Sequence, residues 1–230
     1  MNWKDYFTSS IGKKILVGAT GLFLMIFLVV HCYVNAMIFW MDGGKHFTDA
    51  AAFMGGNVAI RIVEIGLFAA LLLHAIQGLM LAMQNAKRRG VGYAVKAGNK
   101  TSAWYSRSMG LLGTLILLFL ILHLANFWAQ NRYGQMMNPD WKDTDLYTNM
   151  INLFHGPDPS AQIWVVVVYI LGCISLSWHL MHGFYSAFQT FGLTTYRYKG
   201  CIKVLGIAFS ILIPLIFISM PLSMHFGWVN

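Results

Sequence analysis

The sequence predicts an all-α fold, an integral membrane bundle of five transmembrane helices. Of its 230 residues, 57% are hydrophobic and only 10% are charged, whereas soluble domains carry about 25% charged residues. Five apolar runs also reach the roughly 20 residues that a helix needs to cross the hydrocarbon core. The runs cover residues 15–40, 57–84, 108–130, 162–189 and 202–222, within a single domain of residues 1–230.

Each run has the length and composition of a spanning helix. The first, after Lys14, is too long for a signal-peptide core of about 7–15 residues and has no A-x-A-type end. The second is charged only at Arg61 and Glu64, and the third and fourth carry no charge. The fifth begins beside Lys203 and contains two prolines.

The basic residues predict how the bundle is oriented. The net charge is +8, and twelve of the sixteen Lys and Arg residues lie before the first run or in the second and fourth connections. Short basic clusters between apolar runs orient membrane proteins, and the basic side faces the cytoplasm. We therefore expect a cytoplasmic N-terminus and an external C-terminus, and no nucleic-acid partner.

The cysteines exclude several cofactor classes. Cys32, Cys173 and Cys201 form neither a CxxC nor a CxxCH motif. The sequence therefore lacks the usual signatures of c-type haem attachment, zinc ribbons and thioredoxin-like redox sites.

Histidines inside the spans are the main candidates for a function, since ionisable groups in a membrane are costly and usually face an interior. With about 1.5 Å of rise per residue, sequence position converts to depth. His31 and His123 follow the inner ends of their outward-running helices by 16 and 15 residues. His74 and His179 each follow the outer end of an inward-running helix by 17 residues. Four helices thus present two histidine pairs at two depths, as expected for two bis-histidine b-type haems.

Two features refine this hypothesis. Gly78 and Gly183 follow His74 and His179 by one turn on the same helix face, where a missing side chain leaves room for a flat macrocycle. His182 lies one turn from His179 and is an alternative ligand. For any single membrane histidine, a helix–helix hydrogen bond is an equally good explanation; four in two matched pairs favour haem.

Arg61 and Glu64 are opposite charges spaced i, i+3, which allows them to pair. The simpler interpretation is an interfacial ion pair. The functional one is that Glu64 exchanges protons with a quinone, because quinone chemistry moves protons, while Arg61 holds a haem propionate.

The histidine segments resemble the cytochrome b subunit of succinate:quinone oxidoreductases, in the five-helix dihaem type of bacteria. The resemblance is carried by "HCYVN" at His31, "HAIQG" at His74, "HLANF" at His123, "HLMHGFY" at His179 and "ATGL" at Ala19–Leu22. It covers nearly the whole chain, and its order and spacing are more specific than any one motif. The family pattern H-x-x-[polar]-G favours His179 over His182.

The resemblance implies a membrane anchor of a succinate dehydrogenase or fumarate reductase in the bacterial inner membrane. It would bind two haem b groups and pass electrons between a cytoplasmic iron–sulfur subunit and menaquinone. FAD and the iron–sulfur clusters would belong to partner subunits, and this chain has no succinate-oxidising site of its own.

Two alternatives remain open. The cytochrome b subunit of another quinone-linked dehydrogenase or a hydrogenase also places histidine pairs on four helices. A proton-coupled transporter would use the histidines as relays, but it would be expected to have buried acids along a path, and Glu64 is the one acid inside the predicted spans.

Overall fold

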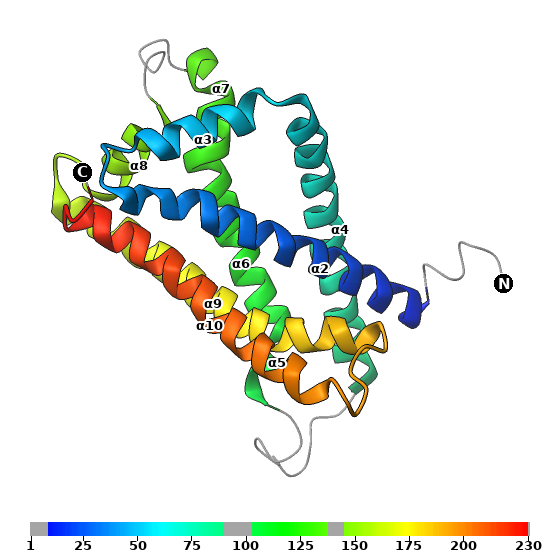
Figure 1. The fold of residues 1–230 in the computed structure, drawn as a ribbon. Helices are drawn as coiled ribbons and strands as arrows, with labels where there is room; N and C mark the ends of the chain where they lie inside the picture. Colours follow the sequence, from blue (N-terminus) through cyan, green and yellow to red (C-terminus); the bar gives the residue numbers. More distant parts are fainter. Residues whose placement is uncertain (1–8, 90–102, 138–144, 230) are drawn as a thin grey trace. The chain divides into compact units, whose positions relative to one another are not determined.

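The computed structural model describes residues 9–89, 103–137 and 145–229 (Figure 1). Within these ranges all regular secondary structure is helical. Five helical stretches are long and apolar enough to cross a membrane: Ser10–Trp40, Val58–Lys87, Met109–Gly134, Gln162–Thr190 and Lys199–His225. The predicted all-α, multi-pass architecture is confirmed at this level.

The helices extend further than the apolar runs at most ends. α2 (Ser10–Ala36) continues as the 3-10 turn η1 (Met37–Trp40), and α4 covers Val58–Arg89. α6 (Met109–His123), η2 (Leu124–Ala129) and α7 (Gln130–Met137) follow one another without a break, and α9 (Pro159–Thr190) and α10 (Lys199–His225) complete the long set. The hydrophobic pattern detects only the apolar part, whereas helical hydrogen bonding continues into the polar flanks.

Polar side chains mark where several helices begin. Ser9 Oγ accepts the backbone N–H of Gly12 at 3.0 Å at the start of α2. Asn57 Oδ1 accepts the N–H of Ala59 at 2.9 Å at the start of α4. Such caps satisfy amides that have no partner within the first turn. They also explain why α3 (Lys45–Gly56) and α4 are separate helices with Asn57 between them.

The long helices display apolar side chains on their surfaces. On α4, Val58, Ile62 and Ile65 are 74%, 67% and 72% exposed. Exposed apolar patches of this extent are rare on soluble monomers and mark a surface that something apolar covers. With five spanning-length helices, lipid is the natural cover, so we treat the chain as a multi-pass membrane protein.

The chain divides into two compact units, and the division falls inside every long helix. Unit 1 comprises Met1–Phe27, Ile65–Leu115 and Ser175–Leu212, and unit 2 comprises Leu28–Glu64, Ile116–Ile174 and Ile213–Asn230. Each unit therefore receives a segment from all five long helices.

Unit 2 contains a buried cluster that the hydrophobic runs did not predict. Short helices α3 and α8 (Leu146–Phe154) lie in the first and third connections between the spanning helices. Tyr147, Met150 and Phe154 form the buried side of α8, and they pack with Phe47 of α3 and with residues of α9 and α10. Both helices are too short to span a membrane, so a hydropathy scan passes over them.

A π-helical segment, η2, interrupts the third long helix immediately after His123. Its hydrogen bonds run from i to i+5, which widens the turn, and such segments often occur at functional sites. Within the described ranges it is the one π-helical stretch. No pattern in the sequence predicted it.

Part of the charge pattern that predicts the orientation lies outside the described residues. Lys4, Lys96 and Lys100 on the basic side are outside them, as are Asp140, Lys142 and Asp143 in the third connection. The orientation of the termini therefore stays a prediction.

Candidate functional site

Unit 1 brings His74 of α4 next to His179 of α9. Their ring centroids are 6.1 Å apart and the ring planes meet at 71°. The two residues are 105 positions apart in sequence and come from different long helices, so only the tertiary fold places them together. Matched depth in the sequence predicted this same pair.

Unit 2 brings together the other two histidines. The rings of His31 on α2 and His123 on α6 have centroids 5.8 Å apart and planes at 86°. Aromatic side chains surround the pair: Phe217 lies 5.5 Å from His31, and Phe127 lies 5.2 Å from His123. Each unit thus contains one pair in a largely apolar setting.

Hydrogen bonds determine which ring nitrogen of His74 carries the proton. Its Nδ1 lies 3.2 Å from the backbone oxygen of Val17 and 3.3 Å from Oγ1 of Thr20. The carbonyl can only accept, and the Thr20 hydroxyl already donates to the Leu16 carbonyl at 2.7 Å. Nδ1 must therefore carry the proton, which leaves the lone pair on Nε2, the form of imidazole that binds a metal.

The other three histidines have different surroundings. Asn35 Nδ2 donates to the His31 carbonyl at 2.7 Å and lies 3.3 Å from its Nδ1. The Nδ1 atoms of His123 and His179 are buried and have no hydrogen-bond partner among the described residues. A buried polar atom without a partner costs about 1–3 kcal/mol. These two rings are therefore not explained as ordinary helix–helix hydrogen bonds through Nδ1.

Glycines other than the predicted Gly78 and Gly183 lie next to both rings of the unit 1 pair, and one of them, Gly21, belongs to the "ATGL" segment. A Cβ added to Gly21 would lie 3.3 Å from Cε1 of His74, and one added to Gly113 would lie 3.8 Å from Cε1 of His179. The predicted glycines, Gly78 and Gly183, would meet no atom within 4 Å. The room for a macrocycle expected beside them stays a prediction.

His179, rather than His182, contacts the His74 ring. Both are on α9 one turn apart, and it is the His179 ring that lies 6.1 Å from His74. The choice of His179 over His182 as a ligand stays a prediction.

Glu64 is held by more partners than the sequence suggested. Arg61 Nη1 donates to its Oε2 at 2.7 Å, as the i, i+3 spacing predicted. Trp128 Nε1 of η2 donates to Oε1 at 2.6 Å, and Arg132 Nη2 of α7 donates to Oε2 at 3.2 Å. All four residues belong to unit 2.

Trp128 and Arg132 are the residues that sequence reasoning missed here. No local sequence pattern links Trp128 or Arg132 to Glu64. A signal was present, because an acid inside a span needs cationic or hydrogen-bonding partners, and few basic residues lie on the outer side. Their separation from Glu64 by more than 60 positions concealed the pairing.

Within the described ranges, no group of three or more His, Cys, Asp or Glu side chains is placed to hold a metal ion. Haem iron needs fewer protein ligands, because the macrocycle supplies most of its coordination and the protein supplies the axial positions.

Comparisons of the chain with protein-family models, with curated proteins and with solved structures found no match.

Proposed function

We propose that the chain is a dihaem cytochrome b that anchors a succinate dehydrogenase or fumarate reductase to the membrane. The observation that carries the haem part is that two histidine pairs, each from two different apolar helices, have ring centroids 5.8 and 6.1 Å apart. The two imidazoles of each pair would supply the two protein ligands that a haem iron needs.

The surroundings of one of the four histidines, His74, support the same assignment. His74 has its proton on Nδ1 and its lone pair on Nε2, and Val17 and Thr20 fix the orientation of the ring. Hydrogen bonding of the distal nitrogen is what metal-bound histidines usually show. His31 and His123 would hold one haem, and His74 and His179 the other. Each haem, when bound, supplies a one-electron carrier of tunable potential.

The connection with succinate and menaquinone rests on the family resemblance of the histidine segments. On that basis the inner membrane of a bacterium is the proposed location, with FAD and iron–sulfur clusters on cytoplasmic partner subunits. This chain would bind those subunits and exchange electrons with the quinone. It would contribute no site for succinate.

Haem content and ligand substitution test the cytochrome assignment. The purified chain should contain two haems by the pyridine haemochrome assay and show a reduced-minus-oxidised b-type spectrum. Replacing His31, His74, His123 or His179 by Ala should remove one haem in each case. His182→Ala is the matched control, since it lies one turn from His179 on the same helix, and it should retain both.

Two outcomes would contradict this assignment. A correctly folded chain without a b-type spectrum would end the haem proposal. Loss of a haem from His182→Ala, with retention in His179→Ala, would transfer the ligand role to His182.

Copurification tests the proposed partners. A tag on this chain should retrieve a flavoprotein and an iron–sulfur protein, with succinate–quinone activity in the eluate. Retrieval of a nickel or molybdenum enzyme would instead identify the related class of hydrogenase or formate dehydrogenase cytochromes.

Glu64 is proposed to exchange protons with the quinone, and Arg61 to hold a propionate. Arg61 and Arg132 both donate to the Glu64 carboxylate, so any proton transfer requires at least one of these contacts to loosen. Glu64→Gln should lower quinone turnover in the assembled complex while leaving the haem count unchanged. Full turnover in this variant would remove Glu64 from the proton path.

A further inference from the structure

The π-helical turn η2 begins at the residue after His123 and is tied to its surroundings on two sides. Asn126 Nδ2 donates to the hydroxyl of Tyr169 on α9 at 3.0 Å. Trp128 Nε1 donates to Glu64 on α4 at 2.6 Å. Both bonds leave from the six-residue stretch Leu124–Ala129, so α4 and α9 both constrain the turn.

The wide turn changes which of the following side chains lie on the same helix face as His123. In an α-helix of 3.6 residues per turn, Trp128 would point about 140° away from His123. A turn closed by i to i+5 hydrogen bonds brings a residue five positions on much closer to the same face. The bond from Trp128 to Glu64 is thus linked to the π geometry.

Glu64 is well suited to fix this turn. Its Oε1 accepts from Trp128, while Arg61 and Arg132 both donate to its Oε2. The side chain of Glu64 is 23% exposed, against 37% for Arg61. Charge-assisted hydrogen bonds in such a partly desolvated site are stronger than neutral ones. The carboxylate is therefore an anchored acceptor rather than a freely rotating one.

The turn is in contact with the His123 ring. Phe127 of η2 lies 5.2 Å from the ring, and Tyr169, which accepts from Asn126, lies 6.2 Å from it. A change in the turn would therefore move groups that pack directly on His123.

We propose that Glu64, acting through Trp128, is a positioning residue that sets the plane of the His123 imidazole relative to His31. The inference rests on the proposed haem ligation by this pair. It assigns Glu64 a role that is separate from proton exchange with a quinone. A protein tunes the potential of a haem through the orientation of its ligands and the hydrogen bonds around them. The π-helical turn would control the orientation of His123.

Two substitutions separate the roles of Glu64. Trp128→Phe removes the indole N–H and keeps both the aromatic ring and the carboxylate. Glu64→Gln keeps an oxygen that can accept from Trp128 but removes the carboxylate. Trp164→Phe on α9 is the control, because Trp164 is 72% exposed and belongs to the same unit.

We expect Trp128→Phe, measured in the assembled complex, to shift the ferric low-spin EPR signal and the midpoint potential of one haem, leaving the other unchanged. Glu64→Gln, which keeps an acceptor for Trp128 but loses the charge that anchors it, should shift the same signals in the same direction and by less. Trp164→Phe should leave both signals close to wild type. Hydrogen–deuterium exchange supplies a readout that does not depend on haem: amides 124–129 should exchange faster in Trp128→Phe than in Trp164→Phe.

The results distinguish this inference from the proposed function. Two haems in the wild type with unchanged EPR, potentials and amide exchange in Trp128→Phe would overturn the positioning role alone. A wild-type chain without haem would overturn the proposed function and the positioning role together. If Trp128→Phe does not assemble, Glu64→Asp retracts the acceptor by one methylene at constant charge. The same spectral shift would then support the inference, and an unchanged spectrum would overturn it.

Discussion

At the scale of single residues, backbone geometry constrains positions that carry no chemistry. Gly43 and Gly44 precede α3 and have φ of +68° and +76°. A side chain in this left-handed region costs about 1–2 kcal/mol. The two differ in their surroundings: a Cβ on Gly43 would meet nothing within 4 Å, whereas one on Gly44 would overlap the ring of Tyr147.

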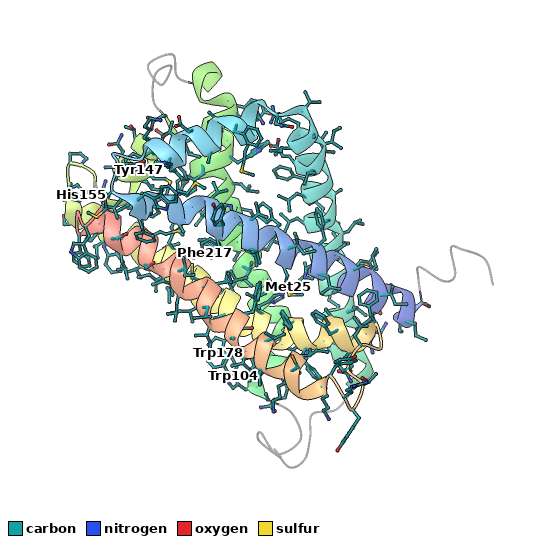
Figure 2. The ribbon with its side chains drawn as sticks, in the orientation of Figure 1. Met25, Trp104, Tyr147, His155, Trp178 and Phe217 are labelled. Carbon is teal, nitrogen blue, oxygen red and sulfur yellow. The ribbon has the colours of Figure 1, made fainter. Side chains whose placement is uncertain are left out.

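Gly44→Ala should therefore destabilise the protein more than Gly43→Ala. Tyr147, labelled in Figure 2, is 8% exposed and packs in the buried cluster, so its ring has little freedom to move away. Forcing a methyl group into packed surroundings costs about 1–3 kcal/mol in addition to the backbone term. Thermal unfolding in detergent measures the difference, and equal midpoints for the two variants would contradict it.

Asp42 provides a pH-dependent contact at the start of α3. The side chain of His46 hydrogen-bonds the carboxylate and lowers the pKa of Asp42, with a further contribution from the His46 backbone N–H at 2.9 Å. Because the pKa of Asp42 is lowered in the folded state, its contact with His46 stabilises the fold fully above the ordinary Asp pKa of about 3.9. This stabilisation is lost as the pH falls through the lowered pKa.

Asp42→Asn should consequently reduce stability at neutral pH, and the difference from wild type should shrink in acid. Unfolding midpoints of the two proteins, compared from about pH 6 to about pH 2, measure this convergence. A difference that stays constant over that range would show that the charge on Asp42 contributes nothing.

At the scale of elements, α10 shows how a proline is accommodated inside a long apolar helix. Pro214 has no N–H, so the carbonyl of Ser210 loses its usual partner four residues on. Ser177 Oγ of α9 donates to that carbonyl at 2.7 Å. Ser210 is fully buried, and side chains of neighbouring helices are known to satisfy carbonyls that proline leaves free in membranes.

Ser177→Ala should cost about 1–3 kcal/mol, because it leaves a buried carbonyl without a partner. Pro214→Ala restores an N–H that can donate to the Ser210 carbonyl. In that background, Ser177→Ala should therefore reduce the free energy of unfolding by less. A double-mutant cycle on unfolding midpoints measures the coupling, and additive effects would contradict this account of the pair.

At the scale of the whole molecule, a histidine pair falls in each of the two compact units, and every long helix contributes to both units. The helices hold the four imidazoles, while the short helices α3 and α8 add their own buried cluster to unit 2. In unit 1, Trp178, the residue before His179, packs 4.8 Å from Trp104 (Figure 2). Aromatic packing thus adjoins a histidine pair in both units.

Orientation in the membrane is testable with the native cysteines. Cys201, near the start of α10, is exposed, whereas Cys32 and Cys173 are buried. The basic fourth connection predicts that Cys201 faces the cytoplasm. A membrane-impermeant maleimide should therefore label inverted vesicles and spare intact spheroplasts, with Cys201→Ser as the control. Labelling from the outside would reverse the predicted topology.

Much of the architecture follows directly from the sequence. Five apolar runs of spanning length identified the five long helices, because helical hydrogen bonding is local and the cost of polar groups in lipid is large. The pairing of His31 with His123 and of His74 with His179 also followed, since a fixed rise per residue converts position into depth. The short helices α3 and α8 did not follow, because neither leaves a spanning-length hydropathy signal.

The sequence by itself determined the five spanning-length helices and which histidines share a level, since both depend on distance along a single helix. Only the tertiary structure decided which side chains meet across helices. It placed the Val17 carbonyl beside His74 Nδ1 and brought Trp128 and Arg132 to Glu64. It also introduced the π turn after His123. Such contacts depend on helix rotation, which close packing and hydrogen bonding set between segments far apart in the chain.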